Sequence, residues 1–142
     1  MILVDANLLI YANERTTVPH DRARAWLDDR LNGDAPVGLP WASLLAFVRI
    51  VSHPRMFERP RSVGEAWRQV EGWLDCRAVW IPMETERHRQ VLGGLLQTAA
   101  TRSTLVSDAH LAALAIEHGL TLCSADGDFA RFPGLRWENP LA

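Results

Sequence analysis

The sequence has 142 residues, of which 48% are hydrophobic, and its formal net charge at pH 7 is −2. This length and hydrophobic content predict a single domain over residues 1–142 that buries its own core. The small negative charge excludes a protein that attracts nucleic acid with its whole surface, so such binding requires a local patch of positive charge.

Residue types that are rare or absent exclude further classes. Two cysteines are too few for a disulfide framework and lack the spacing of a zinc site. All 15 basic residues are arginines, which excludes chemistry that depends on a Schiff-base or P-loop lysine. The N-terminus lacks a basic leader, and no apolar run approaches the roughly 20 residues that span a bilayer. We therefore expect a cytoplasmic protein without membrane segments.

The first half of the chain predicts one buried strand and four helices. The strand is expected over 2–4, and the helices over 7–11, 20–31, 41–51 and 62–74. The third helix is apolar almost all round, which is typical of a helix buried on every side. Ser62 and Glu65 match a capping box at the start of the fourth helix. Four residues of that helix are spaced to share one buried face: Val63, Trp67, Val70 and Leu74.

The second half of the chain alternates strands with helices. Strands are expected over 78–81, 120–124 and 135–137, helices over 84–98 and 107–118, and loops over 99–103 and 125–129. Ser107 is expected to cap the second of these helices, and Gly119 to end it. The alternation predicts an α/β sandwich built on a mainly parallel sheet.

Acidic side chains occupy the ends of predicted elements. Asp5 directly follows the first strand, and Asp108 lies in the first turn of the late helix. Asp126 and Asp128 follow the strand over 120–124. Because ligands gather at the carboxyl ends of parallel strands, we expect these side chains to converge. Clustered carboxylates raise each other's pKa unless a cation neutralises them, and the hard ion Mg²⁺ prefers such oxygen ligands.

Each acidic position except the first has a simple structural alternative. The helix dipole also favours an acidic residue such as Asp108 in the first turn of a helix. The acids on either side of Gly127 are common turn residues. Asn7 fits two roles equally well, a helix cap or a hydrogen-bond donor to the site. Asp5 has no routine structural task, because a carboxylate at the mouth of a core is costly unless something binds it.

Three segments carry a resemblance to a known family: MILVDANLLIYA at 1–12, SDAHLAALAIEHG at 107–119 and SADGDFARFPGLRWENPL at 124–141. In content and order they resemble the PIN-domain ribonucleases, and more narrowly the VapC-type toxins of toxin–antitoxin pairs. The resemblance implies a three-layer α/β/α sandwich with a short, mainly parallel sheet. It also implies an endoribonuclease that uses Mg²⁺ or Mn²⁺ and leaves a 5′-phosphate.

Carried over by motif, the resemblance assigns the metal-binding and catalytic roles to Asp5, Asp108 and Asp126. Ser124 occupies the small hydroxyl position before the last acid, and Asn7 and Asp128 are accessory candidates.

The chain departs from the family at one position of the third helix. The family usually has a Glu there, followed three residues later by an Arg; here Ala46 stands in place of the acid and Arg49 is kept. We therefore expect one firmly bound ion, at Asp5 and Asp108, and a second recruited with the substrate. Whether Ala46 is natural or engineered stays open.

The substrate and partners are predicted from local features. Arg55, Arg59 and Arg61 follow the third helix with a nearby aromatic residue, a pattern that suits single-stranded RNA and equally a solvated loop. His110 is either a packed histidine or a substrate contact, and His88 shows no ligand spacing. The resemblance adds a cognate antitoxin and a homodimer as partners.

Two other classes compete with the nuclease interpretation. An aspartate-nucleophile phosphatase also begins with a strand that ends in Asp, but it requires a second Asp at position 7 and a downstream Lys, and the chain has neither. The stronger rival is a binding module that keeps the fold, binds RNA or its antitoxin, and has lost efficient cleavage. Dependence of turnover on a metal ion distinguishes the two.

Overall fold

The computed structural model describes residues 1–98 and 102–142. In these residues a sheet is formed by β1 (Ile2–Val4), β2 (Val37–Gly38), β3 (Val79–Trp80), β4 (Thr121–Cys123) and β5 (Arg136–Glu138). The α-helices are α1 (Ala6–Asn13), α2 (His20–Leu31), α3 (Trp41–Val51), α4 (Val63–Leu74), α5 (His88–Leu96) and α6 (Val106–His118). Two 3₁₀ turns, η1 (Ser103–Leu105) and η2 (Gly127–Arg131), precede α6 and follow β4.

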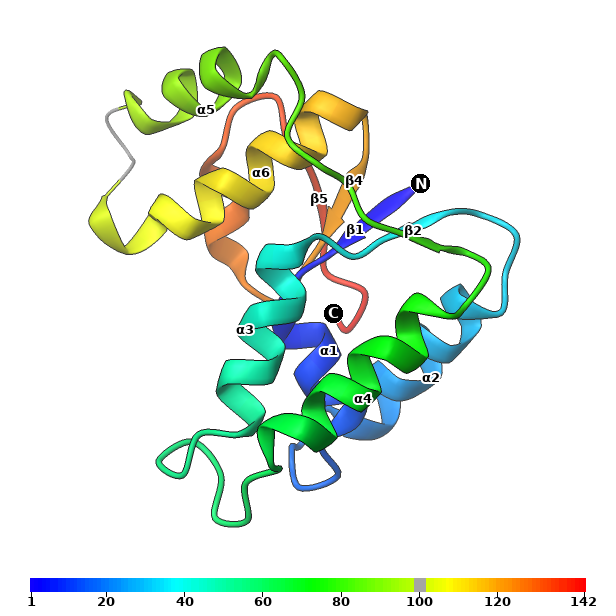
Figure 1. The fold of residues 1–142 in the computed structure, drawn as a ribbon. Helices are drawn as coiled ribbons and strands as arrows, with labels where there is room; N and C mark the ends of the chain where they lie inside the picture. The colour runs from blue at the N-terminus through cyan, green and yellow to red at the C-terminus, as the bar shows by residue number, and fades with distance from the viewer. Residues whose placement is uncertain (99–101) are drawn as a thin grey trace.

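The sheet is parallel throughout, in the order β3-β2-β1-β4-β5, and helices cover both of its faces (Figure 1). Side chains along a strand point alternately to opposite faces. In β1, Ile2 and Val4 join the core formed with α1 to α4, whereas Leu3 joins the core formed with α5 and α6. The predicted three-layer α/β/α sandwich is confirmed.

The first strand leads directly into the first helix, and this junction positions Asp5. The Asp5 carboxylate is the N-cap of α1, where Oδ1 accepts a hydrogen bond from the backbone N–H of Ala6 at 2.7 Å. Because β4 pairs with β1 in parallel, the residues that follow β4 reach the same edge of the sheet. The carboxyl ends of the two central strands therefore meet there.

The prediction that α3 is buried on every side is wrong. Leu44 and Phe47 are fully buried, but Leu45 is 57% exposed and Trp41 is 37% exposed. The ring of Trp41 stacks on that of Trp67 from α4, with centroids 6.3 Å apart. One face of α3 therefore presents apolar side chains to solvent.

The stripe predicted for α4 is also partly wrong. Val63 is 63% exposed and Trp67 is 39% exposed, whereas Ala66, Val70 and Trp73 form the buried face. Trp73 packs edge-on against Phe47 with ring centroids 4.7 Å apart. The capping box of Ser62 and Glu65 is confirmed, so the start of the helix was predictable although its inward face was not.

Several element ends differ from the prediction. The two-residue strand β2 was not predicted. Its Gly38 lies in a tight space, because a Cβ there would be 2.7 Å from the Pro82 side chain. Ser107 does not cap α6, because η1 already turns the chain and the buried Leu105 stands at the N-cap. The helix predicted over 84–98 is shorter, His88–Leu96. Gly119 does end α6, with a φ of 67°.

Other predicted segments have simpler outcomes. Most of the loop predicted over 99–103, residues 99–101, lies outside the described residues. The turn predicted over 125–129 contains the start of η2. In the described part of the chain, no helix is long and apolar enough to cross a membrane.

Candidate active site

Asp5 is held in place by hydrogen bonds on both carboxylate oxygens. Its Oδ1 accepts from the N–H of Ala6 at 2.7 Å, and its Oδ2 accepts from the hydroxyl of Ser124 at 2.8 Å. Burial raises the pKa of Asp5 above its usual value, the two hydrogen bonds lower it, and the nearby charge of Asp126 raises it further. The net result is a carboxylate with a fixed orientation and an unfavourable negative charge.

Ser124 connects the two central strand ends through its fully buried hydroxyl. While it donates to Asp5, its Oγ accepts from the side-chain amide of Asn7 at 3.1 Å and from the N–H of Asp126 at 3.0 Å. The Asn7 Oδ1 in turn accepts from the N–H of Ala125 at 3.4 Å. Asn7 therefore bonds to this cluster and does not cap α1, whose N-cap is Asp5.

Asp108 approaches the same edge of the sheet from the first turn of α6. Burial, together with the charges of Asp5, Asp126 and Asp128, raises the pKa of Asp108 to about 6. Asp5 and Asp126 are joined through Ser124, and Asp108 and Asp128 lie close enough to this pair for their charges to interact.

The loop after β4 orients the remaining acids. The Asp126 Oδ1 accepts from the N–H of Asp128 at 2.9 Å and so caps η2. Asp128 also forms an exposed ion pair with Arg131 at 3.4 Å. The turn interpretation of Asp126 and the site interpretation are thus compatible, because its second oxygen makes no hydrogen bond among the described residues.

The carboxylates are close without forming a closed metal cage. Among the described residues, no group of three or more His, Cys, Asp or Glu side chains is assembled at metal-binding distances. Mg²⁺ commonly takes only one or two protein carboxylates and fills its other positions with water and substrate phosphate. The oxygen-only donor set and the mutual repulsion of the acids therefore fit such an ion.

Arg49 and Ala46 lie on α3. Arg49 is exposed and, in the part of the chain that the structure describes, forms no ion pair with the site carboxylates. Ala46 is half-buried and packs against the core shared with α1. The helix therefore offers no carboxylate at the position where the resemblance leads one to expect a Glu.

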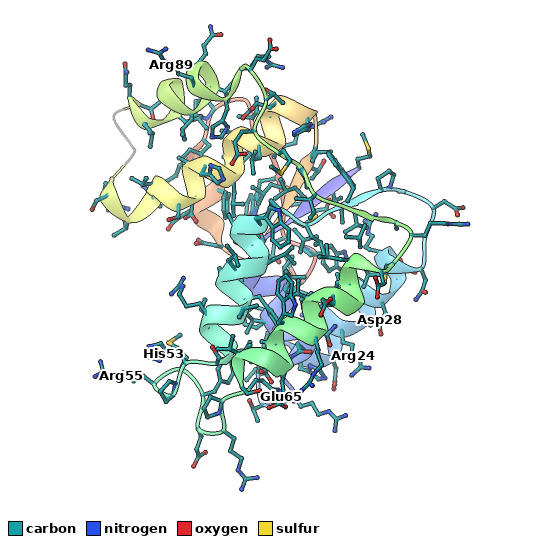
Figure 2. All side chains as sticks on the ribbon, in the orientation of Figure 1. Arg24, Asp28, His53, Arg55, Glu65 and Arg89 are labelled. Atoms are coloured by element: carbon teal, nitrogen blue, oxygen red, sulfur yellow. The ribbon has the colours of Figure 1, made fainter. Side chains whose placement is uncertain are left out.

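The arginines after α3 differ in their surroundings. Arg61 binds the buried Glu14, with its Nη2 3.3 Å from Oε2, so its guanidinium is already engaged. Arg55 and Arg59 are exposed, and Figure 2 shows Arg55 pointing away from the body of the protein near His53. Arg59 lines a cavity of about 860 Å³ between this loop and residues 14–17. Arg55 and Arg59 are thus available to a phosphate, whereas Arg61 serves Glu14.

Removal of the Arg61 guanidinium is expected to destabilise the fold. In Arg61→Ala, the Glu14 side chain, only 9% exposed, loses its cationic partner, and we expect a loss of about 1–2 kcal/mol in the free energy of unfolding measured in urea. Arg24→Ala is the control, because the Arg24–Asp28 pair on α2 is more than half exposed on both sides (Figure 2) and contributes less than about 0.5 kcal/mol. Equal losses in both variants would contradict this account.

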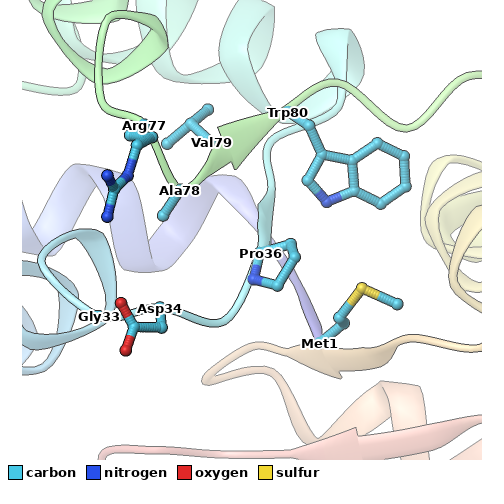
Figure 3. A pocket seen from close by; sticks show the side chains of 8 residues that line it. All are labelled: Met1, Gly33, Asp34, Pro36, Arg77, Ala78, Val79 and Trp80. Carbon is cyan, nitrogen blue, oxygen red and sulfur yellow. The ribbon is translucent and has the colours of Figure 1, made fainter.

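A second cavity lies at the opposite edge of the sheet. Its volume is about 450 Å³, and Figure 3 shows Met1, Pro36 and Trp80 among the side chains that line it. Met1 and Pro36 directly precede β1 and β2, and Ala78, which also lines the cavity, directly precedes β3, whereas Asp5 follows the end of β1. The cavity is therefore separate from the carboxylate site.

The structure defines the class of protein, a parallel α/β/α sandwich with acidic side chains gathered at the carboxyl ends of its central strands. Comparison with known proteins defines the family. The PIN domain profile matches residues 2–135. The chain is 43% identical over 142 residues to Ribonuclease VapC37 of Mycobacterium tuberculosis, covering 100% of this chain and 99% of that protein. The chain therefore belongs to the PIN-domain family, among the VapC-type proteins.

Solved structures share this fold at low sequence identity. Mycobacterium tuberculosis VapC20, described as a Sarcin-Ricin loop cleaving toxin, superimposes with a TM-score of 0.70 at 18% identity, covering 96% of this chain and 99% of that one. A toxin–antitoxin complex from Klebsiella pneumoniae contains a chain with a TM-score of 0.65 at 17% identity, covering 99% and 98%. These likenesses support the fold assignment.

Proposed function

We propose that the protein is a Mg²⁺-dependent endoribonuclease that acts as the toxin of a toxin–antitoxin pair. The observation that carries the proposal is the convergence of four carboxylates from three separate segments; together with burial, which is the larger cause, their charges raise the pKa of Asp108 to about 6. The relatives named as VapC ribonucleases support the reaction class. An RNA substrate in turn implies that the protein acts in the cytoplasm.

Asp5, Asp108 and Asp126 are proposed to hold the divalent ion, with Asp128 as an accessory acid. When bound, the ion supplies activation of water and neutralisation of charge at the scissile phosphate. Ser124 and Asn7 fix the direction of the Asp5 carboxylate, which reduces the reorganisation needed when the charge of the substrate arrives.

The proposed RNA path leads from the carboxylates along α3 to the loop that follows it. Arg49, Arg55 and Arg59 are exposed there, and arginine contacts phosphate through a planar set of donors. Because the net charge of −2 gives no overall attraction to RNA, binding requires a local positive patch of this kind. Arg61 contributes to the path only indirectly, because it pairs with Glu14.

An antitoxin and a second copy of the chain are the proposed partners. The exposed apolar side chains of Trp41, Leu45, Val63 and Trp67 on α3 and α4 support a protein interface, since large aromatic residues are enriched at such surfaces. The solved toxin–antitoxin complex with this fold supports the antitoxin as one of these partners.

The proposal is tested by incubating the purified protein with single-stranded and structured RNA in the presence of Mg²⁺, of Mn²⁺ or of excess EDTA. Cleavage that requires the metal and leaves 5′-phosphate ends is the expected result. RNA binding without metal-dependent turnover would instead select the alternative, a binding module. That alternative is favoured by one observation, the absence of an acid at Ala46.

Ala46→Glu is expected to raise cleavage, by roughly tenfold at limiting Mg²⁺, because an added carboxylate contributes a further ligand. The rate is measured against Mg²⁺ concentration, with thermal unfolding as a check that the half-buried position accepts Glu. Ala42→Glu, one turn earlier on the exposed face of α3, is the matched control and should leave the rate unchanged. A well-folded Ala46→Glu with wild-type metal dependence would contradict the idea that a ligand is missing.

A further inference from the structure

A second polar cluster lies where α5 meets α6 and is centred on a buried carboxylate. The Glu117 side chain is fully buried, and its Oε1 accepts from the N–H and the hydroxyl of Thr85 at 2.9 and 2.7 Å. Its Oε2 lies 2.5 Å from Nδ1 of His88. Burial by itself raises the pKa of Glu117, but the hydrogen bonds from Thr85 and His88 outweigh it and lower the pKa. Both oxygens of Glu117 are therefore engaged, one by Thr85 and the other by His88.

The hydrogen bond to Glu117 engages one nitrogen of His88, and the other nitrogen faces His110. In the tautomer with hydrogen on Nδ1, His88 donates to Glu117 through that nitrogen. Nε2 of His88 then presents a lone pair. This nitrogen lies 3.2 Å from Nδ1 of His110.

The outer nitrogen of His110 faces a carboxylate as well. Its Nε2 lies 3.6 Å from Oε1 of Glu84, so Nδ1 is the nitrogen that faces His88. The two imidazole rings meet edge to face, with an interplanar angle of 79° and centroids 5.0 Å apart. The two facing nitrogens, Nε2 of His88 and Nδ1 of His110, are thus close enough to share either a proton or a metal ion.

We propose that His88 and His110 bind a borderline divalent transition-metal ion, for which Zn²⁺ is the representative, and that this ion joins α5 to α6. Zinc–nitrogen bonds of 2.0–2.1 Å in tetrahedral geometry place two ligand nitrogens about 3.3 Å apart, close to the observed 3.2 Å. A carboxylate behind each metal-binding imidazole is the usual outer arrangement at such sites, and Glu117 and Glu84 occupy these positions.

The remaining ligands must come from solvent. No third His, Cys, Asp or Glu completes the group within the described residues. The side chains of His88 and His110 are 15% and 30% exposed, so water can reach the nitrogens. Imidazole ligands favour zinc over Mg²⁺, whereas the oxygen ligands of the carboxylate site favour Mg²⁺. The two sites are therefore expected to take different ions.

The test is calorimetric titration of the purified protein with ZnCl₂ in excess Mg²⁺, which occupies the carboxylate site. We expect one Zn²⁺ per chain, an affinity at least ten times weaker in His88→Gln, and no change in the control His53→Gln, whose side chain lies in the loop after α3. Circular dichroism without metal verifies that each variant is folded. The proposal is overturned if the wild type binds no Zn²⁺ or if His88→Gln binds it normally.

A second variant tests the outer carboxylate. Glu84→Gln keeps both ligand nitrogens and changes a side chain that is 48% exposed, so it should fold normally and weaken Zn²⁺ binding about tenfold. Loss of Zn²⁺ binding in Asp5→Asn would instead place the zinc at the carboxylate site and overturn the proposal. Nitrogen-15 spectra that show an N–H···N bond between the two imidazoles persisting in saturating Zn²⁺ would overturn it as well, since a proton would then fill the gap.

Discussion

Asp5→Asn is expected to lower Mg²⁺-dependent RNA cleavage by at least about 100-fold and to leave the fold intact. Asn keeps an oxygen that can accept from the N–H of Ala6 but removes the negative charge that the ion requires. Because burial already disfavours the ionised form of Asp5, the neutral amide should cost the fold little. The measurement is the initial rate of RNA cleavage at saturating Mg²⁺, together with thermal unfolding of the same sample.

The control for Asp5→Asn is Asp34→Asn, the same change of side chain at an exposed position at the opposite edge of the sheet. Its cleavage rate should stay within about twofold of the wild type, as expected for a surface substitution. A folded Asp5→Asn that cleaves RNA at the wild-type rate would remove the carboxylate site from the mechanism.

Asp108→Asn is expected to lose cleavage and yet to gain stability at pH 8 in the absence of divalent ions. The folded carboxyl group keeps its proton up to a pKa of about 6, whereas the unfolded one releases it near 3.8. The folded state therefore binds more protons between these values, and its stability falls as the pH rises through that window. The gain above pH 6 should be about 1 kcal/mol, because solvent screens a half-exposed group.

The stability of Asp108→Asn is measured by urea unfolding in EDTA at pH 8 and below about pH 3, where the acid is protonated in both states and the gain should disappear. Asp21→Asn, also in the first turn of a helix but exposed, should show no such gain. Added Mg²⁺ should stabilise the wild type more than Asp108→Asn. A gain of equal size at both pH values would point to packing rather than charge as its cause.

The gathering of the acidic side chains at one edge of the sheet was predictable because it depends on a regular feature of parallel sheets. An apolar run that ends in Asp5, and a second strand followed by Ser124 and Asp126, place polar side chains at the carboxyl ends of strands wherever the sheet is parallel. The resemblance to the PIN-domain family added that Asp108 belongs with them. The pairing of β1 with β4 then supplies the spatial contact that no local pattern contains.

The less predictable features depend on contacts between distant parts of the chain. The ion pair between Arg61 and Glu14 joins residues 47 positions apart. The sequence alone therefore predicted the same RNA-binding role for Arg61 as for the neighbouring arginines. Trp67 and Trp73 are both tryptophans on the same helix, so their residue type does not tell which one is buried. The packing of Trp73 against Phe47 decides it. The partners of Glu117, Thr85 and His88, are also remote in sequence, 32 and 29 positions away, which is why His88 showed no ligand spacing.

Calorimetric titration with Mg²⁺ or Mn²⁺ in the absence of RNA tests most directly whether carboxylates from separate segments share one divalent ion. We predict one bound ion per chain in the wild type and in Asp34→Asn, and loss of that binding in Asp5→Asn and in Asp108→Asn alike. Ion binding that survives both substitutions would show that the carboxylates converge without forming a metal site.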